Sequence, residues 1–349
     1  MKIKEFQNYL KNKRIDYCLL LNSEKSMDHN FTYFTQIPES INIYALLIIP
    51  KTKEPFLLVS RLEYSIAKKY SRIKRIYKIN KEPLKQLKSL IKAKYIGINK
   101  NNISLNQYRL LKKELKAKFI DISKFLLKLR SIKTKDEINL LKKSCSYASI
   151  IMKKTISYCN KNKTELQIKE FIENEIKKLN LEPAFPPIVA SGSNSSKPHH
   201  LSENKRLKGF IVIDLGVKYK NYCSDITRTI YIGKPNKKEI MIYNEVLKVN
   251  EDSISSKINS CSLLYKKARK KLGEYFIHGL GHGIGIEIHE LPNLKETSRD
   301  KLKENMIYTI EPGYYKGKIG IRIEDSVLFT KNKIEILTKV KKELITYKP

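Results

Sequence analysis

Residues 210–229 read FIVIDLGVKYKNYCSDITRT. Two runs rich in apolar and β-branched residues flank a short polar segment, which is the pattern of a β-hairpin. A turn centred on Tyr219-Lys220 would place Asp214 directly opposite Asp225. Like charges opposite each other destabilise a sheet, so this pair predicts a compensating cation. Tyr219-Lys220 is not a favoured two-residue turn, and a bulge would shift the register.

A second stretch further along the chain has the same layout. The segment TIEPG is followed by a turn at Gly317-Lys318 and then by GIRIED. This register would place Glu311 opposite Glu324. Two hairpins would then each present a facing pair of carboxylates.

Between the two hairpins the chain reads HGLGHGIGIEIHE at residues 278–290. Its four glycines argue against a helix, so His278, His282 and His289 are displayed from a strand or a turn. Four carboxylates with one imidazole suit a pair of divalent ions, and Mn, Co, Fe and Zn are all compatible with these ligands. Two such ions about 3.5–4 Å apart could activate a water nucleophile.

Each acidic residue also has an ordinary explanation when it is considered alone. Asp214 could be a turn residue, Asp225 a helix or turn cap, and Glu324 one half of an ion pair with Arg322. The metal interpretation is favoured because these carboxylates and His282 occur together in ordered strand and glycine contexts.

The length of 349 residues predicts two domains. Residues 1–127 alternate short apolar runs with amphipathic ones and are expected to form an α/β domain, in which His29 has a loop or structural role. Residues 128–349 mix strands with helices and are expected to be α+β. Thr134 with Glu137 predicts the start of a long helix, and Thr164 with Gln167 predicts the start of the next.

Composition limits the class of protein. The 70 Lys+Arg residues exceed the 35 Asp+Glu residues, which gives a net charge of +35. Because the lysines are spread along the whole chain, we attribute the charge to compositional bias and expect weak, nonspecific polyanion binding instead of specific nucleic-acid recognition. The five cysteines are scattered and odd in number, which is typical of reduced thiols. We find no apolar run long enough for a membrane span and expect a cytoplasmic protein.

The carboxylate and histidine motifs resemble the pita-bread metallopeptidases, which include Xaa-Pro dipeptidases (prolidases), aminopeptidase P and methionine aminopeptidases. The resemblance covers about residues 129–337. It implies a pita-bread catalytic domain, preceded here by a smaller creatinase-like N-terminal domain that methionine aminopeptidases usually lack. It also implies a two-metal centre, with Mn or Co foremost and Zn or Fe as alternatives. The implied ligands are Asp214, Asp225, His282, Glu311 and Glu324, with Asp225 and Glu324 bridging.

The same resemblance assigns roles around the metals. Glu311 is implied as the general base, and His289 as the residue that contacts the substrate amide or the tetrahedral intermediate. His199, His278 and Arg322 resemble substrate-binding or supporting residues, and packing roles are nearly as well supported for these three. His200, which follows His199, departs from the family pattern and is expected to be structural. Asn305 stands where the family commonly has glycine, which is tolerable if its backbone is left-handed.

The function implied by this resemblance is hydrolysis of the bond between an N-terminal residue and a following proline, in dipeptides or in longer peptides, by a homodimeric enzyme. Two alternatives remain open. One is a broader aminopeptidase similar to methionine aminopeptidase. The other is a noncatalytic pita-bread binding protein with affinity for polyanions. The presence of all five predicted metal ligands favours the enzyme.

Overall fold

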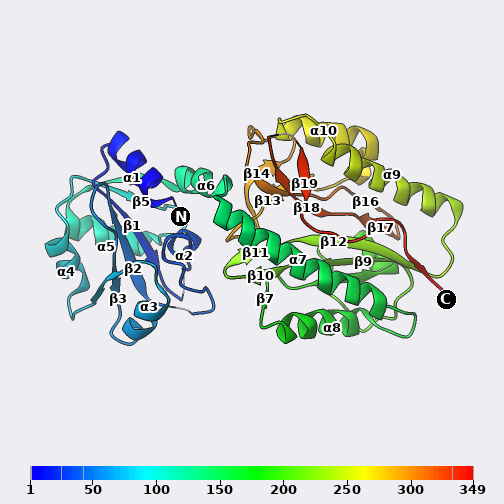
Figure 1. The fold of residues 1–349 in the computed structure, drawn as a ribbon, viewed down its shortest axis with the longest axis horizontal. Helices are drawn as coiled ribbons and strands as arrows, with labels where there is room; N and C mark the ends of the chain where they lie inside the picture. The colour runs from blue at the N-terminus through cyan, green and yellow to red at the C-terminus, as the bar shows by residue number, and fades with distance from the viewer. Residues whose placement is uncertain (1, 25, 42, 332, 349) are drawn as a thin grey trace. The chain divides into compact units, whose positions relative to one another are not determined.

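The structure is a computed structural model that describes residues 2–24, 26–41, 43–331 and 333–348 (Figure 1). The chain forms two compact units, Met1–Leu129 and Arg130–Pro349, which we call the N-terminal and C-terminal units. None of the helices in the described part of the chain combines the length and the apolar character that crossing a bilayer requires.

A six-stranded sheet forms the centre of the N-terminal unit. Its strands are β1 (Tyr17–Asn22), β2 (Ala45–Pro50), β3 (Phe56–Val59), β4 (Arg75–Lys78), β5 (Tyr95–Ile98) and β6 (Lys118–Asp121). The helices are α1 (Ile3–Asn12), α2 (His29–Thr35), α3 (Tyr64–Tyr70), α4 (Pro83–Leu90), α5 (Leu105–Leu115) and α6 (Ser123–Ser131), of which the last two residues of α6 belong to the C-terminal unit. The strand order is β4-β3-β2-β1-β5-β6, and β2 runs antiparallel to both of its neighbours.

Apolar side chains from two helices cover one face of this sheet. Leu87 of α4 and Leu111 of α5 pack with Leu19, Ile48 and Ile96 of the strands. This arrangement agrees with the α/β pattern expected from the alternation of apolar and amphipathic runs. His29 is the first residue of α2 and its Nδ1 lies 2.5 Å from a carboxylate oxygen of Glu39, which agrees with a structural role.

The C-terminal unit contains α7 (Lys135–Tyr158), α8 (Glu165–Lys178), α9 (Lys237–Ile254) and α10 (Cys261–Leu272), with short 3-10 helices η1 (Gly192–Ser196) and η2 (Gly273–Tyr275). Both predicted capping boxes are confirmed: Thr134 with Glu137 begins α7, and Thr164 with Gln167 begins α8. Each cap satisfies backbone N–H groups that the first turn of a helix leaves without partners.

Short sheets lie between these helices. The strands are β7 (Glu182–Pro183), β8 (Ile188–Ser191), β9 (Gly209–Leu215), β10 (Val217–Tyr219), β11 (Tyr222–Cys223), β12 (Ile226–Ile232), β13 (Gly281–Gly283), β14 (Glu290–Leu294), β15 (Ile307–Ile310), β16 (Gly313–Lys316), β17 (Ile319–Arg322), β18 (Asp325–Phe329), β19 (Ile334–Ile336) and β20 (Thr346–Tyr347). They form the sheets β20-β12-β9-β8, β14-β13-β15-β18-β19, β11-β10-β7 and β16-β17.

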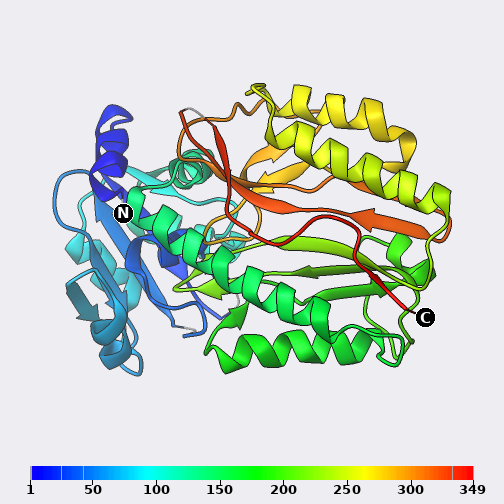
Figure 2. The same cartoon turned by 45° about the vertical axis from the view of Figure 1, so that its right-hand side comes forward.

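Two apolar cores pack against these sheets, one on the side of α7 and α8 and the other on the side of α9 and α10. In the first, Ile151 of α7 and Ile172 of α8 pack against Ile211 of β9. In the second, Val246 of α9 and Leu264 of α10 pack among the strands that include β15 and β18. Figure 2 shows the strands enclosed between the α7/α8 pair and the α9/α10 pair. Polar residues that face away from both cores are therefore brought together between the sheets.

The predicted pairing of Asp214 with Asp225 is wrong. Asp214 pairs with Thr227, and Asp225 lies in the break between β11 and β12. The turn of the hairpin is formed by Lys220 and Asn221, whose φ angles are 47° and 69°. A two-residue turn with both residues left-handed matches the twist of antiparallel strands, and asparagine tolerates this conformation. The turn is therefore one residue further along the chain than predicted.

The predicted register of the second hairpin is confirmed by the ladders on both sides of Glu311 and Glu324. The two glutamates occupy opposite positions in the gap between these ladders, and Gly317 begins the predicted turn with a φ of 60°. The pairs that flank the gap are Ile310 with Asp325 and Gly313 with Arg322. The two glutamates are thus fixed from both sides by regular strand pairing.

Candidate metal centre

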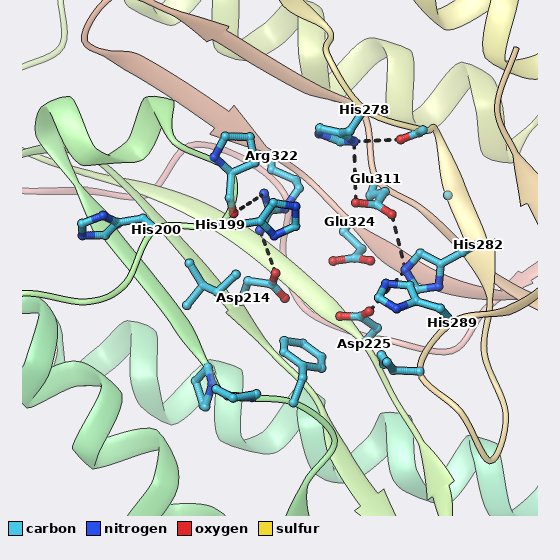
Figure 3. Close-up of a pocket in the computed structure, with 18 of the residues that line it drawn as sticks. His199, His200, Asp214, Asp225, His278, His282, His289, Glu311, Arg322 and Glu324 are labelled. Carbon is cyan, nitrogen blue, oxygen red and sulfur yellow. Dashed lines mark hydrogen bonds and ion pairs between the residues drawn. The ribbon is translucent and has the colours of Figure 1, made fainter. Parts of the chain in front are cut away.

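One cavity of about 560 Å³ in the C-terminal unit is lined by every residue that was predicted for the site (Figure 3). The residues are His199, Asp214, Asp225, His278, His282, His289, Glu311, Arg322 and Glu324. They come from strands of three different sheets and from the loops and breaks between strands. The fold therefore brings together side chains that are as far as 125 positions apart in sequence.

The five predicted ligands lie at strand ends and breaks. Asp214 is in β9 and His282 is in β13, whereas Asp225, Glu311 and Glu324 lie where a ladder stops. Ligand atoms of Asp225, His282 and Glu324 all lie within 4.8 Å of one another. Figure 3 shows these side chains and Glu311 directed toward the same space.

The imidazole of His282 is oriented as a metal ligand requires. Its Nδ1 lies 3.2 Å from the carbonyl oxygen of Gly283. A carbonyl can only accept, so Nδ1 carries the proton and donates it. The lone pair is then on Nε2, which lies 3.6 Å from Asp225 Oδ2 and 3.5 Å from Glu311 Oε1. Burial lowers the pKa of His282 to about 3, which keeps the ring neutral.

The carboxylates are crowded into a space with little solvent. Burial raises the pKa of Asp225 well above its ordinary value, and the charges of Glu324, Asp214 and Glu311 raise it further. Burial also raises the pKa of Glu324 well above its ordinary value and that of Glu311 to about 7. Like charges that are buried together require either protonation or a nearby cation.

Two buried carboxylate oxygens without a hydrogen-bond donor among the described residues also indicate that this site requires a cation. Among the residues that the structure describes, no hydrogen-bond donor reaches Asp214 Oδ1 or Asp225 Oδ1. Buried carboxylate oxygens are normally satisfied by a donor or a cation. The carboxylate oxygens and the Nε2 of His282 are donor atoms that divalent transition metals accept. The residues present therefore fit the metal ions that the resemblance implies.

Arg322 is the cation that the fold itself supplies. Its Nη2 donates to Asp214 Oδ2 at 2.7 Å, its Nε donates to Thr227 Oγ1 at 3.1 Å, and its Nη1 donates to the hydroxyl of Tyr315 at 3.0 Å. Thr227 in turn donates to Glu324 Oε2 at 2.6 Å. Arg322 therefore fixes one predicted ligand directly and another through a threonine.

The remaining histidines surround this centre. The Nδ1 of His278 donates to the carbonyl of Gly279 at 2.8 Å, and its Nε2 lies 3.0 Å from the Tyr315 hydroxyl. Burial lowers the pKa of His278 to about 4 and also lowers that of His289. The rings of His289 and His282 are 4.3 Å apart between centroids. These neutral rings can exchange hydrogen bonds with a ligand in the cavity.

His200 belongs to a second cluster of possible metal ligands, with Glu165 and Glu203. The Glu165 carboxylate is fully buried and accepts hydrogen bonds from Ser191 N, Asn194 Nδ2, His200 Nε2 and Glu203 N at 2.7–3.1 Å. Because these donors satisfy both oxygens, the cluster needs no cation. This agrees with the structural role expected for His200.

Several residues around the cavity were not predicted from the sequence. Phe185, Pro187 and Ile188 form an apolar part of its lining. Tyr315 joins His278 to Arg322, yet its neighbour Tyr314 looks equally suitable in sequence. The register of β16 could have distinguished Tyr315 from Tyr314, because alternate residues of a strand point to opposite sides of the sheet.

Comparison with known proteins agrees with this geometry. Residues 139–331 match the model of metallopeptidase family M24, and residues 2–132 match the creatinase/prolidase N-terminal domain. The Xaa-Pro dipeptidase of Pyrococcus furiosus is 36% identical over 343 residues, which cover 92% of this chain and 97% of the relative.

Solved structures give the same result. The prolidase of Pyrococcus horikoshii superposes with a TM-score of 0.89 at 34% identity, covering 99% of both chains. The X-Pro aminopeptidase of Thermotoga maritima superposes with a TM-score of 0.88 at 30% identity, covering 97% of this chain and 100% of that one. The expected α+β fold, with a pita-bread catalytic domain after a creatinase-type domain, is confirmed. The chain belongs to metallopeptidase family M24.

Proposed function

We propose that this metallopeptidase hydrolyses the bond between an N-terminal residue and a following proline, in Xaa-Pro dipeptides or in longer peptides. The observation that carries the proposal is the convergence of four carboxylates and the lone pair of His282 on one cavity that also has an apolar wall. The names of two similar proteins, an Xaa-Pro dipeptidase and a prolidase, support this substrate class.

We propose two divalent ions as the cofactor, with Mn or Co as the metal. Asp214, Asp225, His282, Glu311 and Glu324 would hold them, with Asp225 and Glu324 shared between both ions. The donor set of oxygens and one imidazole nitrogen supports this choice without excluding Zn or Fe. When bound, such ions supply Lewis acidity toward the scissile carbonyl and toward water.

We assign the proton transfers to Glu311. It accepts a proton from the attacking water and then delivers it to the proline nitrogen as the C–N bond breaks. In the metal-free protein burial raises the pKa of Glu311 to about 7, and its Oε1 lies 3.5 Å from the Nε2 of His282, so the carboxylate is placed beside the proposed metal ligands. Thr309 Oγ1 lies 3.3 Å from Glu311 Oε1 and holds the carboxylate in place.

We assign the substrate contacts to His289 and His199. Both line the cavity, and the lowered pKa of His289 leaves a neutral ring with one N–H that can donate to the substrate or to the developing oxyanion. His278 and Arg322 orient these groups. The hydrogen bond from Arg322 to Asp214 and the contact of His278 with Tyr315 are the observations that favour this orienting role.

We further propose a cytoplasmic homodimer with separate domains at residues 1–127 and 128–349. The five buried, free cysteines support a reducing compartment. Analytical ultracentrifugation tests the dimer, and expression of residues 128–349 alone tests the domain boundary.

The direct test loads the purified protein with Mn²⁺ or Co²⁺ and compares three substrate types. These are Xaa-Pro dipeptides, Xaa-Pro-Xaa tripeptides and Met-Ala-Xaa peptides. We expect metal-dependent turnover of the first, the second or both, and little turnover of the third. Turnover of the third type alone would favour a methionine-aminopeptidase-like activity, and no turnover of any type would refute the enzyme proposal.

A further inference from the structure

His289 lies at the end of an irregular loop in the C-terminal unit. Residues 284–289 connect β13 to β14, and the loop closes where Gly283 pairs with Glu290. Such a loop has few ladder hydrogen bonds to fix its side chains. Some other contact must therefore hold the imidazole of His289 beside that of His282.

Glu290 supplies that contact, because its buried carboxylate accepts hydrogen bonds from the backbone of the loop. Its side chain is only 1% exposed, and its Oε1 accepts from the backbone N–H groups of Ile286 at 3.1 Å and Glu287 at 3.3 Å. Gly285 packs directly against the carboxylate, because a Cβ at this position would lie 2.4 Å from Glu290 Oε2. One carboxylate thus gathers three consecutive residues of the loop.

Two cations near the start of the C-terminal unit hold the carboxylate in turn. Lys133 Nζ lies 3.1 Å from Glu290 Oε2, and its side chain is also only 1% exposed. Arg130 Nε lies 3.8 Å from Glu290 Oε1, and Arg130 forms a second ion pair with Glu287. Lys133 is itself fixed, because its backbone N–H donates to the carbonyl of Asn305 at 2.8 Å.

We infer that Glu290 is a positioning residue for His289, through the hydrogen bonds that its Oε1 accepts from Ile286 and Glu287. Glu290 is the first residue of β14 and directly follows His289, so a Glu290 side chain fixed in the interior also fixes the backbone from which the His289 ring reaches the cavity. The inference rests on the proposed function, because it assumes that His289 contacts the substrate. Nothing in it requires Glu290 to touch the substrate.

The test compares two double variants that remove the same two charges and differ in the side chain at position 290, which keeps a polar amide in one variant and is apolar in the other. Lys133→Met/Glu290→Gln keeps an amide oxygen that can accept from Ile286 and Glu287. Lys133→Met/Glu290→Met has nearly the same shape and lacks that oxygen. Both remove one positive and one negative charge, so neither leaves an unpaired buried ion from this pair. Thermal melts establish that each variant is folded at the assay temperature.

We expect the Gln variant to turn over Ala-Pro within about threefold of the wild type. We expect the Met variant to lose about 10-fold to 100-fold in kcat, because a displacement of about 1 Å in a reacting group has effects of this size. In a His289→Ala background the two double variants should be equal. An undiminished difference in that background, or equal activity in the wild-type background, overturns the inference.

A second measurement is independent of turnover. Imidazole ¹H–¹⁵N correlation spectra, with the His289 signal assigned from His289→Ala, should show one sharp His289 signal in the Gln variant and a broadened or multiple signal in the Met variant. The same signal in both overturns the inference even if the enzyme proposal stands. If the wild type turns over no peptide, the enzyme proposal fails while the spectra still decide the positioning role.

Gly285, which also contacts the Glu290 carboxylate, is the site of a further variant in case the Met variant does not fold. Gly285→Ala adds a Cβ that displaces the Glu290 carboxylate while leaving both charges in place. We expect the same broadening of the His289 signal and a loss of kcat that disappears in the His289→Ala background. A sharp, unshifted His289 signal in Gly285→Ala overturns the inference.

Discussion

Arg322→Met tests how the fold tolerates four carboxylates in one cavity. The Arg322 side chain is 5% exposed and its guanidinium donates to Asp214 Oδ2 at 2.7 Å. Removing one partner of a buried ion pair costs about 3–5 kcal/mol, because the other charge remains buried without compensation. For a domain of this size such a loss lowers the melting temperature by about 6–20 °C.

The assay is thermal unfolding of the metal-free protein, followed by circular dichroism. Lys271→Met is the matched control, because it removes a cation from a half-exposed ion pair with Asp252 in the same unit. We expect this control to cost about 0–1 kcal/mol. Adding Asp214→Asn to Arg322→Met should recover most of the lost stability, since no unpaired charge then remains from this pair.

Two results would refute this reasoning. One is an Arg322→Met protein that melts as the wild type does. The other is a double variant whose stability is simply the sum of the two single losses. Either result would mean that Asp214 does not depend on Arg322 for compensation.

Three further predictions concern the metal centre. Glu311→Gln should lower kcat by about 10²–10⁴-fold without lowering the melting temperature, and unchanged turnover would remove Glu311 from the role of base. Asp225→Asn should lower the number or affinity of bound Mn²⁺ ions measured by calorimetry. Glu203→Gln, in the cluster of Glu165, His200 and Glu203, should change neither. The reverse result would mean that Mn²⁺ binds at this second cluster. Metal-free wild type and metal-free Glu311→Gln share the same buried histidines, so the difference between their melting temperatures isolates Glu311. The melting temperature of the wild type relative to Glu311→Gln should be lower at pH 8 than at pH 5.5. A raised folded pKa, about 7 for Glu311, gives stability that is complete below the unfolded value near 4.5 and is lost as the pH rises through 7. Saturating Mn²⁺ should remove this pH dependence, and a relative melting temperature that rises with pH would contradict it.

The two hairpins illustrate what strand patterns can and cannot predict. The Glu311 and Glu324 register was predictable because Gly317-Lys318 is a turn that glycine favours. The Asp214 and Asp225 register was not, since the decisive left-handed turn uses Lys220 and Asn221. Glycine marks such turns clearly, whereas lysine and asparagine mark them weakly.

Individual residues show the same limit. Asn305 has a φ of 68°, so the left-handed backbone expected at this position is confirmed, and asparagine is one of the few residues with a side chain that tolerates it. Tyr315 and Glu290 could not be recognised, because their roles depend on partners that are distant in sequence, namely His278 and Lys133. The roles assigned to the cavity residues stay predictions until they are tested by mutation.

The gap between the two ladders has a consequence for protein engineering. At this gap the backbone N–H of Glu311 donates to the carbonyl of Leu280, and that of Glu324 donates to the carbonyl of Thr227. The two residues that carry these carboxylates, Glu311 and Glu324, therefore also form backbone hydrogen bonds to neighbouring strands and loops. Grafting the ligand side chains onto another scaffold would not transfer the centre unless the strand crossing that carries them were transplanted as well.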